Sequence, residues 1–530
     1  MKKKSTLYIL ILVIWGICLA FLLLSLYFIF PTVNIENIGA RIAAYVFLVL
    51  NTLVLGFLWF GSIKDLIFSC SFAINGKKMM KRYDVIKNTE VDKNYNPKFV
   101  LLYCTRNDFN AEALKECMNQ DYKNVDTVIL DDSDDKNYLS RIDRFAIENG
   151  VKVVRRKNKT GFKAGNLNNY LKGRMDYDYF VVLDSDEIIP HDYINKVLKY
   201  FSYDKNCGAV QARHKAQKGQ NVFQRLLGLS VGSNGSSTQV VKNFYGSNAL
   251  IGHGMTISRE CYMKTGGFPL VVAEDISFAV DIRNNGFDII YAPDIECYEE
   301  FPVNYLSLKK RQCKWTQGNL EYMRKYNHEI KDCKMLWFEK LDLMLSHYSL
   351  PIVPVLSFML VVFTILLGFL GYPIIHYSIF IYCLMVLFLC SPLIPDLFVY
   401  KKDRHNIFLI IPYFLLNIVT YASLAPMMIR TVFLGLFGKK ATFLVTPKED
   451  EKFTLTQAIL GTVDSLIFAS AVLILCVLCC GSGAPVVLIV TSSMLAPFVV
   501  LISNIRIGKK AENEKNRKIL LKNLPVPNLG

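Results

Sequence analysis

The sequence has few charged residues, and its acidic residues are scarce toward both ends. Charged residues make up 20% of the 530 residues, below the roughly 25% typical of soluble domains. Most Asp and Glu lie between about residue 80 and residue 345, and the flanks contain uncharged apolar runs of membrane length. This distribution excludes an ordinary cytosolic enzyme, a disordered protein and a pure channel.

The sequence also lacks the motifs of several common classes of enzyme. No G-x-G-x-x-G and no P-loop lysine follows the first expected strand, which disfavours a dehydrogenase or a kinase. The 14 cysteines are scattered without paired metal spacing. Cys476 and Cys479 form a C-x-x-C inside an apolar run, where packing is the favoured interpretation.

Six apolar runs are long enough to span a bilayer at about 1.5 Å per residue. They cover 7–30, 42–60, 350–370, 374–394, 458–480 and 486–502. The first is too long for a signal-peptide core and precedes no small-residue cleavage site. A further apolar stretch, 407–437, is interrupted by Pro and Arg residues, which favours an interfacial or broken helix.

Lys and Arg flank these runs on one side, whereas the opposite turns carry no charge. Six spans arranged as three hairpins therefore place the middle domain in the cytoplasm. The expected units are a membrane hairpin (1–65), an α/β domain (97–300), interfacial helices (301–346), a second hairpin (347–400), a broken helix with a loop (405–455), a third hairpin (456–505) and a cytosolic tail (506–530).

The middle domain alternates short apolar runs with helix-like segments. The runs at 99–104, 127–130, 152–154 and 179–183 are typical of buried parallel strands, and 111–119 is typical of a helix between two of them. This βαβ series predicts a doubly wound, mainly parallel sheet. Ligands of such sheets bind beyond the carboxyl ends of the strands.

Unusual polar segments follow each of these runs, at 105–108, 131–135, 161–168 and 184–187. The carboxylates of Asp184 and Asp186, spaced D-x-D, can hold a hard divalent cation. Lys163, with glycines on both sides, lets a cation and open backbone approach a diphosphate. Taken singly, Asp131 and Asp132 could be a turn and Lys163 a solvated cation, but their joint placement favours a functional site.

These motifs, in this order, resemble the membrane-embedded family 2 glycosyltransferases of the cellulose, hyaluronan and chitin synthase kind. The matching segments are Asp131-Asp132, KAGNLN at 163–168, the D-x-D, GGFP at 266–269, and the acidic pair Glu274-Asp275. The resemblance implies an α/β domain of the GT-A type inserted between transmembrane hairpins, a UDP-sugar donor, and Mg²⁺ or Mn²⁺ as cofactor.

The resemblance also implies roles for individual residues. The nucleotide-sugar would contact Thr105, Asp131, Asp132, Lys163, Asp184, Arg311 and Lys314. The metal ion would be held by Asp186 with Asp184. Asp275, next to Glu274, would be the general base.

Residues 311–315 resemble the Q-x-x-R-W motif of the family, with two departures. Arg311 stands where Gln is usual, and Lys314 stands where Arg is usual, so the bidentate fork of the guanidinium is lost there. Trp315 is expected to stack on the acceptor sugar, with an interfacial anchor as the alternative. His253 is a further acceptor candidate, although a hydrogen-bonded loop histidine is as common.

Phe443, Val445, Thr446 and Lys448 match the F-x-V-T-x-K gating loop of cellulose synthases. Such a loop can close over a bound nucleotide. The basic residues Arg155, Arg156 and Lys159 are expected to form a solvated face.

The prediction is a processive, inverting glycosyltransferase of the plasma membrane. It would use UDP-glucose, or UDP-N-acetylglucosamine as second choice, to elongate a β-linked polysaccharide and secrete it through its own channel. No nucleic acid partner is expected. The alternative is transfer of a single sugar to a membrane lipid or short acceptor. A transporter or sensor with an inactive domain is disfavoured, because Asp186 and Glu274-Asp275 are present.

Overall fold

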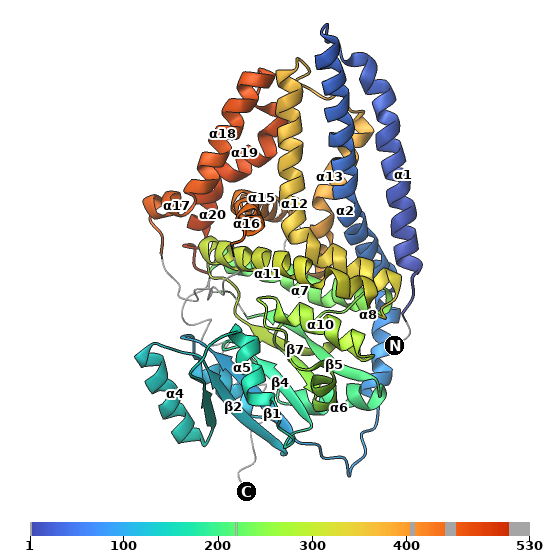
Figure 1. Cartoon of the computed structure of the whole chain (residues 1–530). Coiled ribbons are helices and arrows are strands. Elements are labelled where there is room, and N and C mark those ends of the chain that lie inside the picture. Colours follow the sequence, from blue (N-terminus) through green and yellow to red (C-terminus); the bar gives the residue numbers. More distant parts are fainter. Residues whose placement is uncertain are drawn as a thin grey trace.

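The computed structural model describes residues 3–217, 219, 221–402, 408, 410–439 and 452–507. An α/β domain lies on one side of a layer of long apolar helices (Figure 1). The predicted gating residues Phe443, Val445, Thr446 and Lys448 lie outside the described residues, as does the tail after residue 507.

Seven helical segments of the described chain are long and apolar enough to cross a membrane, judged by length and composition. They cover Thr6–Thr32, Ile38–Lys87, Trp337–Phe369, Ile379–Phe398, Ile410–Leu436, Val463–Cys480 and Ala484–Ile502. Six of them overlap the six predicted spans. The seventh is the interrupted stretch, which consists of α15 (Ile410–Ala422) and α16 (Ala425–Leu436). Figure 1 shows α15 and α16 nearly end-on, whereas α12 is seen along its length.

The other helices of this layer differ in length. α2 has 50 residues, so at about 1.5 Å per residue it extends well beyond a bilayer and reaches the α/β domain. The bounds are α1 (Thr6–Ile29), α2 (Ile38–Lys87), α12 (Trp337–Phe369), α13 (Ile379–Cys390), α14 (Ile394–Lys402), α17 (Leu455–Gly461), α18 (Val463–Cys480), α19 (Val487–Met494) and α20 (Ala496–Ile502).

The α/β domain is built on one seven-stranded sheet with the order β3-β2-β1-β4-β6-β5-β7. β6 runs antiparallel to its neighbours β4 and β5, and the other neighbouring strands are parallel. The bounds are β1 (Phe99–Thr105), β2 (Val125–Asp131), β3 (Lys152–Arg155), β4 (Tyr179–Leu183), β5 (Cys207–Ala216), β6 (Met255–Ser258) and β7 (Asp288–Glu299). The predicted mainly parallel α/β sheet is therefore confirmed.

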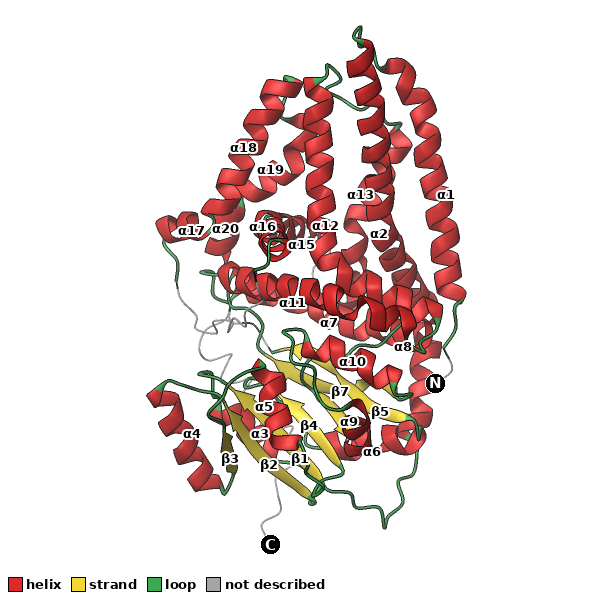
Figure 2. Ribbon diagram, viewed as in Figure 1, coloured by secondary structure: helices red, strands yellow, loops and turns green. Residues whose placement is uncertain are grey.

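Helices cover both faces of this sheet (Figure 2). They are α3 (Ala111–Met118), α4 (Lys136–Asn149), α5 (Phe162–Leu171), α6 (Tyr193–Tyr203), α7 (Val222–Ser233), α8 (Gln239–Tyr245), α9 (Arg259–Thr265) and α10 (Glu274–Asn284). Alternate residues of β1 enter two separate cores, because side chains of a strand point to opposite faces in turn. The core that contains Leu101 and Tyr103 is continuous with Tyr8 of α1 and Trp59 of α2. One continuous core thus joins the sheet to the membrane helices.

One long helix, α11 (Tyr305–Asp332), lies between the sheet and the apolar helices (Figure 1). Asn304 caps its first turn by accepting a hydrogen bond from the backbone N–H of Ser307 at 2.8 Å. Arg324 of α11 donates to the carbonyl oxygen of Gly435 in α16, at 2.9 Å. α11 therefore joins the sheet side of the molecule to the crosswise pair α15 and α16.

Candidate active site

The polar segments after the strands meet at one edge of the sheet, because β1, β2 and β3 are parallel and end in register. Thr105 at the end of β1 is paired with Asp131 at the end of β2, and Asp131 is paired with Arg155 at the end of β3. β4 pairs with the other side of β1 and ends at Leu183, so the D-x-D follows at the same edge. This is the edge at which parallel sheets bind ligands.

A cavity of about 1000 Å³ opens at this edge and continues between the apolar helices. The predicted site residues in its wall are Thr105, Asp132, Lys163, Asp184, Asp186, His253, Glu274, Asp275, Arg311, Lys314 and Trp315. Asp131 is buried next to the wall, with 1% of its surface exposed. The structure therefore brings the predicted site residues of the described chain to one place.

Asp131 and Asp132 are held by two consecutive arginines, the last residue of β3 and the residue after it. Asp131 accepts hydrogen bonds from the Ser133 backbone N–H at 2.8 Å and from Arg155 Nε at 2.6 Å. Asp132 is bound by two nitrogens of Arg156, at 2.9 and 2.6 Å. The prediction that Arg156 lies on a solvated face is wrong. Its side chain is only 6% exposed, and it neutralises the carboxylate of Asp132 at the cavity wall.

Thr105 belongs to a hydrogen-bond chain that links two strand ends. Its hydroxyl donates to Asp108 Oδ1 at 2.8 Å, and Ser185 within the D-x-D donates to Asp108 Oδ2 at 2.6 Å. The segment after β1 and the segment after β4 are thus fixed relative to each other.

Lys163 lies in the first turn of α5, which starts after Gly161 in the left-handed conformation (φ 73°). Its ammonium pairs with Asp184 and donates to the carbonyl oxygen of Gly252 at 2.7 Å. Burial opposes the charge of Lys163, but the carboxylates of Asp184 and Glu274 outweigh it and raise the pKa of this lysine. Lys163 therefore stays a cation in the cavity wall.

Glu274 and Asp275 form the first turn of α10 and face the same cavity. Burial and the neighbouring Asp275 raise the pKa of Glu274 to about 7, and burial also raises the pKa of Asp275. The Asp275 carboxylate lies against Gly252, because a Cβ placed on that glycine would be 3.2 Å from Asp275 Oδ2. Gly252 thus touches both Lys163 and Asp275.

Lys314 reaches these acidic groups from α11. Burial lowers the pKa of Lys314, while Asp184, Glu274 and Asp275 act in the opposite direction. Lys163 and Lys314 therefore lie near both the D-x-D and the Glu274-Asp275 pair. The two acidic motifs face the same side of the sheet edge and not opposite sides.

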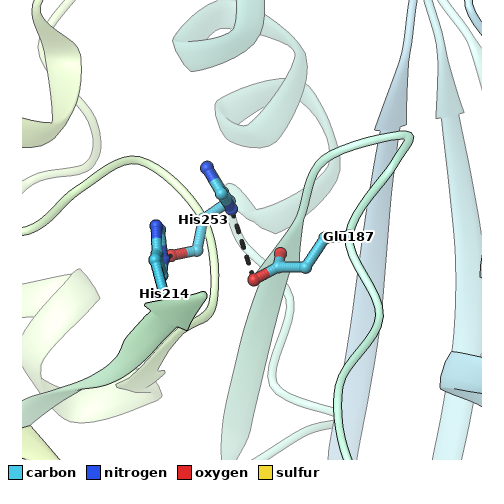
Figure 3. A group of neighbouring side chains, drawn as sticks. All are labelled: Glu187, His214 and His253. Atoms are coloured by element: carbon cyan, nitrogen blue, oxygen red, sulfur yellow. Dashed lines mark hydrogen bonds and ion pairs between the residues drawn. The ribbon is translucent and has the colours of Figure 1, made fainter. Parts of the chain in front are cut away.

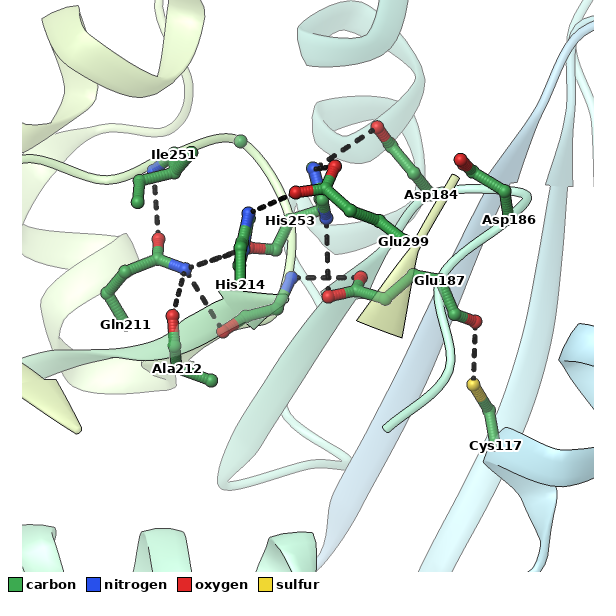
Figure 4. Close-up of polar contacts among 12 residues, drawn as sticks. Cys117, Asp184, Asp186, Glu187, Gln211, Ala212, His214, Ile251, His253 and Glu299 are labelled. Atoms are coloured by element: carbon green, nitrogen blue, oxygen red, sulfur yellow. Dashed lines mark hydrogen bonds and ion pairs between the residues drawn. The ribbon is translucent and has the colours of Figure 1, made fainter. Parts of the chain in front are cut away.

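His253 belongs to a buried network of two histidines and two glutamates behind the D-x-D (Figures 3 and 4). Its Nδ1 lies 3.2 Å from Glu187, and its Nε2 lies 3.2 Å from Glu299 and 4.0 Å from Asp184. His214 Nδ1 lies 3.0 Å from the other oxygen of Glu299. Burial opposes the charge of His253, but Glu187 and Glu299 raise its pKa well above the usual value.

Two groups of side chains offer ligand atoms to a metal ion. Asp184 and Asp186 offer carboxylate oxygens at the cavity wall, which fits Mg²⁺ or Mn²⁺; Asp186 Oδ2 also accepts from the Glu300 backbone N–H at 3.1 Å. One donor atom each of Glu187, His214 and His253 lie within 4.8 Å of one another. The nitrogens of both histidines already face Glu299, so the oxygen set fits a hard cation better.

Trp315 projects from α11 into the cavity wall and is 44% exposed. The guanidinium carbon of Arg311, one turn earlier, lies 4.5 Å from the centre of the Trp315 ring system. An exposed aromatic face in a polar cavity can stack on a sugar ring.

Sequence reasoning placed Asp108 and Glu187 in the polar segments without giving them a role, and it missed His214 and Glu299; all four surround the predicted residues. Glu187 directly follows the D-x-D, and this was the available signal. His214 and Glu299 come from β5 and β7, and no spacing in the sequence joins them to the D-x-D.

Part of the chain matches a known protein family. Residues 179–400 match the family model described as glycosyl transferase family group 2. Within this range the chain is similar to family 2 glycosyltransferases. The mainly parallel sheet and the long apolar helices agree with the predicted α/β domain among membrane helices.

The chain is also similar to the protein named glucans biosynthesis glucosyltransferase H in two strains of Shewanella baltica. In both, the identity is 27% over 190 residues, which is 32% of this chain and 25% of the relative. The chain thus spans about a quarter of the length of these curated relatives.

Solved structures of distant glycosyltransferases also resemble this chain. A mannosyltransferase from Pyrobaculum calidifontis, in complex with GDP-Man and Mn²⁺, is 19% identical with a TM-score of 0.44, covering 71% of this chain and all of that one. S. aureus TarS 1–349 with UDP-GlcNAc is 15% identical with a TM-score of 0.35, covering 58% of this chain and 93% of that one. At these TM-scores the likenesses are too distant to argue from.

Proposed function

We propose that the chain is an inverting glycosyltransferase that transfers sugar from a UDP-sugar to a growing β-linked polysaccharide. The observation that carries this proposal is the single cavity that joins the D-x-D, Lys163, Lys314 and the Glu274-Asp275 pair. A sugar diphosphate needs cations, an acceptor hydroxyl needs a base, and both kinds of group line this wall.

The diphosphate end of the donor is assigned to Lys163 and Lys314. Both are cations beside the D-x-D, so they compensate the charge that develops on the leaving diphosphate. Asp184 and Asp186 would hold Mg²⁺ or Mn²⁺, which when bound supplies further charge neutralisation there. Thr105, Asp131 and Asp132, at the ends of β1 and β2, are assigned to the uridine.

Asp275 is assigned as the general base, with Glu274 beside it. Asp275 Oδ1 accepts the Ile276 backbone N–H at 2.9 Å, which holds the carboxylate in place. A carboxylate with a raised pKa accepts a proton from the acceptor hydroxyl more readily than an exposed one. A single displacement at the anomeric carbon of an α-linked donor then gives a β-linked product.

The acceptor is assigned to Trp315 and the rest of the cavity, with His253 held nearby. Beyond Trp315 the wall is formed by residues of α2, α12 and α13, namely Leu55, Leu58, Trp59, Val353, Met385, Phe388 and Leu389. This continuation supports extrusion of a polymer between the helices of a plasma-membrane protein with its α/β domain in the cytoplasm. The 443–448 segment would gate the nucleotide.

UDP-glucose is the first choice of donor and UDP-N-acetylglucosamine the second. The apolar continuation of the cavity also suits the alternative, in which one sugar is transferred to a membrane lipid. Product size separates the two: a long polysaccharide supports the proposal, and a single added sugar extractable into organic solvent supports the alternative.

The test uses the purified full chain in detergent with each UDP-sugar and Mg²⁺ or Mn²⁺. We expect UDP release with polymer formation, followed by linkage analysis of the product. Asp275→Asn should reduce turnover at least about a hundredfold, because the base is lost. Asp281→Asn, on the same helix α10 but outside the cavity wall, is the matched control. Turnover retained in Asp275→Asn would remove the base assignment.

A further inference from the structure

His253 lies where three segments of the cavity wall meet. Its Nδ1 is 3.2 Å from Glu187, which directly follows the D-x-D, and its Nε2 is 3.2 Å from Glu299 at the end of β7. The histidine itself is buried and belongs to the loop before β6. Figure 4 shows the ring between the two carboxylates. One side chain therefore connects the D-x-D segment, the end of β7 and the loop before β6.

The ring of His253 is held as a cation by the carboxylates around it. The acidic groups that face it are Glu187, Glu299 and Asp184, the last at 4.0 Å from Nε2. Burial opposes the charge of His253, but these carboxylates outweigh it and raise the pKa of the ring. The side chain of Glu187 is fully buried. If the ring were neutral, Glu187 would lose this ion pair, and an unpaired buried charge is costly.

The main chain of the same loop is fixed from the other side, by β5. The carbonyl oxygen of His253 accepts hydrogen bonds from Gln211 Nε2 and from His214 Nε2, both at 2.9 Å. The backbone N–H of Gly254 donates to Glu187 at 3.0 Å. The peptide of His253 is thus anchored to the sheet, while its ring reaches across to the D-x-D segment.

The residue before His253 touches two groups that are assigned to the reaction. The carbonyl oxygen of Gly252 accepts from Lys163 at 2.7 Å, and a Cβ on Gly252 would lie 3.2 Å from Asp275 Oδ2. The D-x-D segment carries Asp184, which pairs with the same lysine. The distance between this loop and the D-x-D segment therefore sets the spacing between the proposed donor site and the proposed base.

The surroundings of the ring leave little room for an acceptor sugar. Both nitrogens of His253 face carboxylates at 3.2 Å, and His214 stacks on the ring with 4.2 Å between the ring centres. The sequence suggested an acceptor contact for His253, but the two nitrogens that would bind a sugar hydroxyl are engaged. This arrangement favours a role in holding the site together.

We propose that His253 is a positioning residue: its imidazolium, set between Glu187 and Glu299, holds the D-x-D segment at a fixed distance from the loop that contacts Asp275. This rests on the proposed function, since it concerns the alignment of the same donor and base. His253 transfers no proton in this role. Because a misplacement of about 1 Å can cost about a hundredfold in rate, loss of the link should lower kcat more than it weakens donor binding.

The experiment compares His253→Gln with the wild type, using the full chain in detergent with each UDP-sugar and Mn²⁺. Glutamine keeps a hydrogen-bond donor and removes the charge. The matched control is His191→Gln, because His191 lies 3.8 Å from Glu116, is 10% exposed in its side chain and lies outside the cavity wall. The measurements are kcat and KM for the UDP-sugar, the share of UDP released by transfer to water, and hydrogen exchange of segment 184–188 by mass spectrometry.

We expect His253→Gln to lower kcat at least about tenfold, while the KM for the UDP-sugar stays within about threefold. The share of UDP released by transfer to water should rise, because water needs less alignment than an acceptor hydroxyl. Hydrogen exchange of segment 184–188 should become faster, whereas His191→Gln should match the wild type in every measurement. The double variant Glu187→Gln/His253→Gln should regain part of the lost kcat, because the unpaired buried carboxylate is gone.

Three results would overturn the proposal. One is unchanged hydrogen exchange of segment 184–188 in His253→Gln. The second is a raised KM for the UDP-sugar or the acceptor with kcat retained, which would make His253 a substrate contact. The third is additive loss in the double variant relative to Glu187→Gln and His253→Gln, which would mean that the two side chains act independently. If the wild type turns over no UDP-sugar but segment 184–188 exchanges faster in His253→Gln alone, the proposed function fails and the link between the two segments stands.

Discussion

At the scale of single residues, the Glu274-Asp275 pair should control how the rate depends on pH. Burial raises both pKa values, and the neighbouring Asp275 adds to the rise for Glu274, whose pKa reaches about 7. A raised pKa of Asp275 means that its base form is lost at a higher pH than that of an exposed aspartate. We expect kcat/KM to decline as the pH falls, with the acidic limb above the usual pKa of an aspartate.

Glu274→Gln should leave this acidic limb nearly in place, because burial is the cause of the raised pKa of Asp275. A pH series of UDP release from both proteins checks this. A limb that moves clearly to lower pH would instead mean that the charge of Glu274 raises the pKa of Asp275.

Arg156 supports a second prediction at this scale. Arg156→Met leaves the Asp132 carboxylate, 10% exposed, without its partner. Breaking such a pair on one side costs about 3–5 kcal/mol in the free energy of unfolding. We expect a lower thermal midpoint in detergent for Arg156→Met than for the exposed neighbour variant Lys157→Met. The double variant with Asp132→Asn should recover part of the loss.

The residues that could be predicted from sequence are those that directly follow apolar runs. Lys163 and the D-x-D were found in this way, because parallel strands deliver their last residues to one edge. The partners of these residues could not be predicted from their position after an apolar run. Arg156 meets Asp132 across 24 positions, and His253 meets Glu299 across one strand and two helices, so only tertiary packing brings them together.

At the scale of elements, the loop before β6 positions two reacting groups with one residue. Gly252 has a φ of 90°, its carbonyl oxygen accepts from Lys163, and its Cα lies against Asp275. Gly252→Ala would strain the backbone and place a Cβ 3.2 Å from Asp275 Oδ2. We expect kcat to fall at least about tenfold with little change in the KM for the donor.

The matched control is Gly150→Ala at the end of α4. It has a similar left-handed conformation (φ 66°), but no atom lies within 4 Å of an added Cβ. If both variants lose the same activity, backbone strain alone explains the effect and the contact with Asp275 is unimportant.

Elements differed in how well their sequence predicted them. The buried strands and the six uninterrupted apolar runs could be predicted, because the length and composition of each segment fit only one kind of element. The segment 407–437 was ambiguous, because it is apolar enough to span and yet contains Pro412 and Pro426. The structure divides it into α15 and α16, and both run across the direction of α12.

At the scale of the whole molecule, the cavity that continues between the helices should decide product length. Gly61 of α2 lines it, and the space beyond its Cα is open. Gly61→Leu should narrow the path, shorten the polymer and leave the first transfer intact. Gly16→Leu, on α1 and equally open, is the control. Size-exclusion analysis of radiolabelled product checks this. Unchanged polymer length in Gly61→Leu would favour release into the cytoplasm or a single transfer.

The length of α2 has a mechanical consequence. At about 1.5 Å per residue, its 50 residues measure about 75 Å, more than twice the roughly 30 Å of a hydrocarbon core. The part of α2 that extends beyond the bilayer shares a hydrophobic core with the sheet and so connects the sheet to the membrane. Under the proposed function, the groups assigned to catalysis therefore lie at a constant depth below the lipid surface, and the growing sugar chain advances past them.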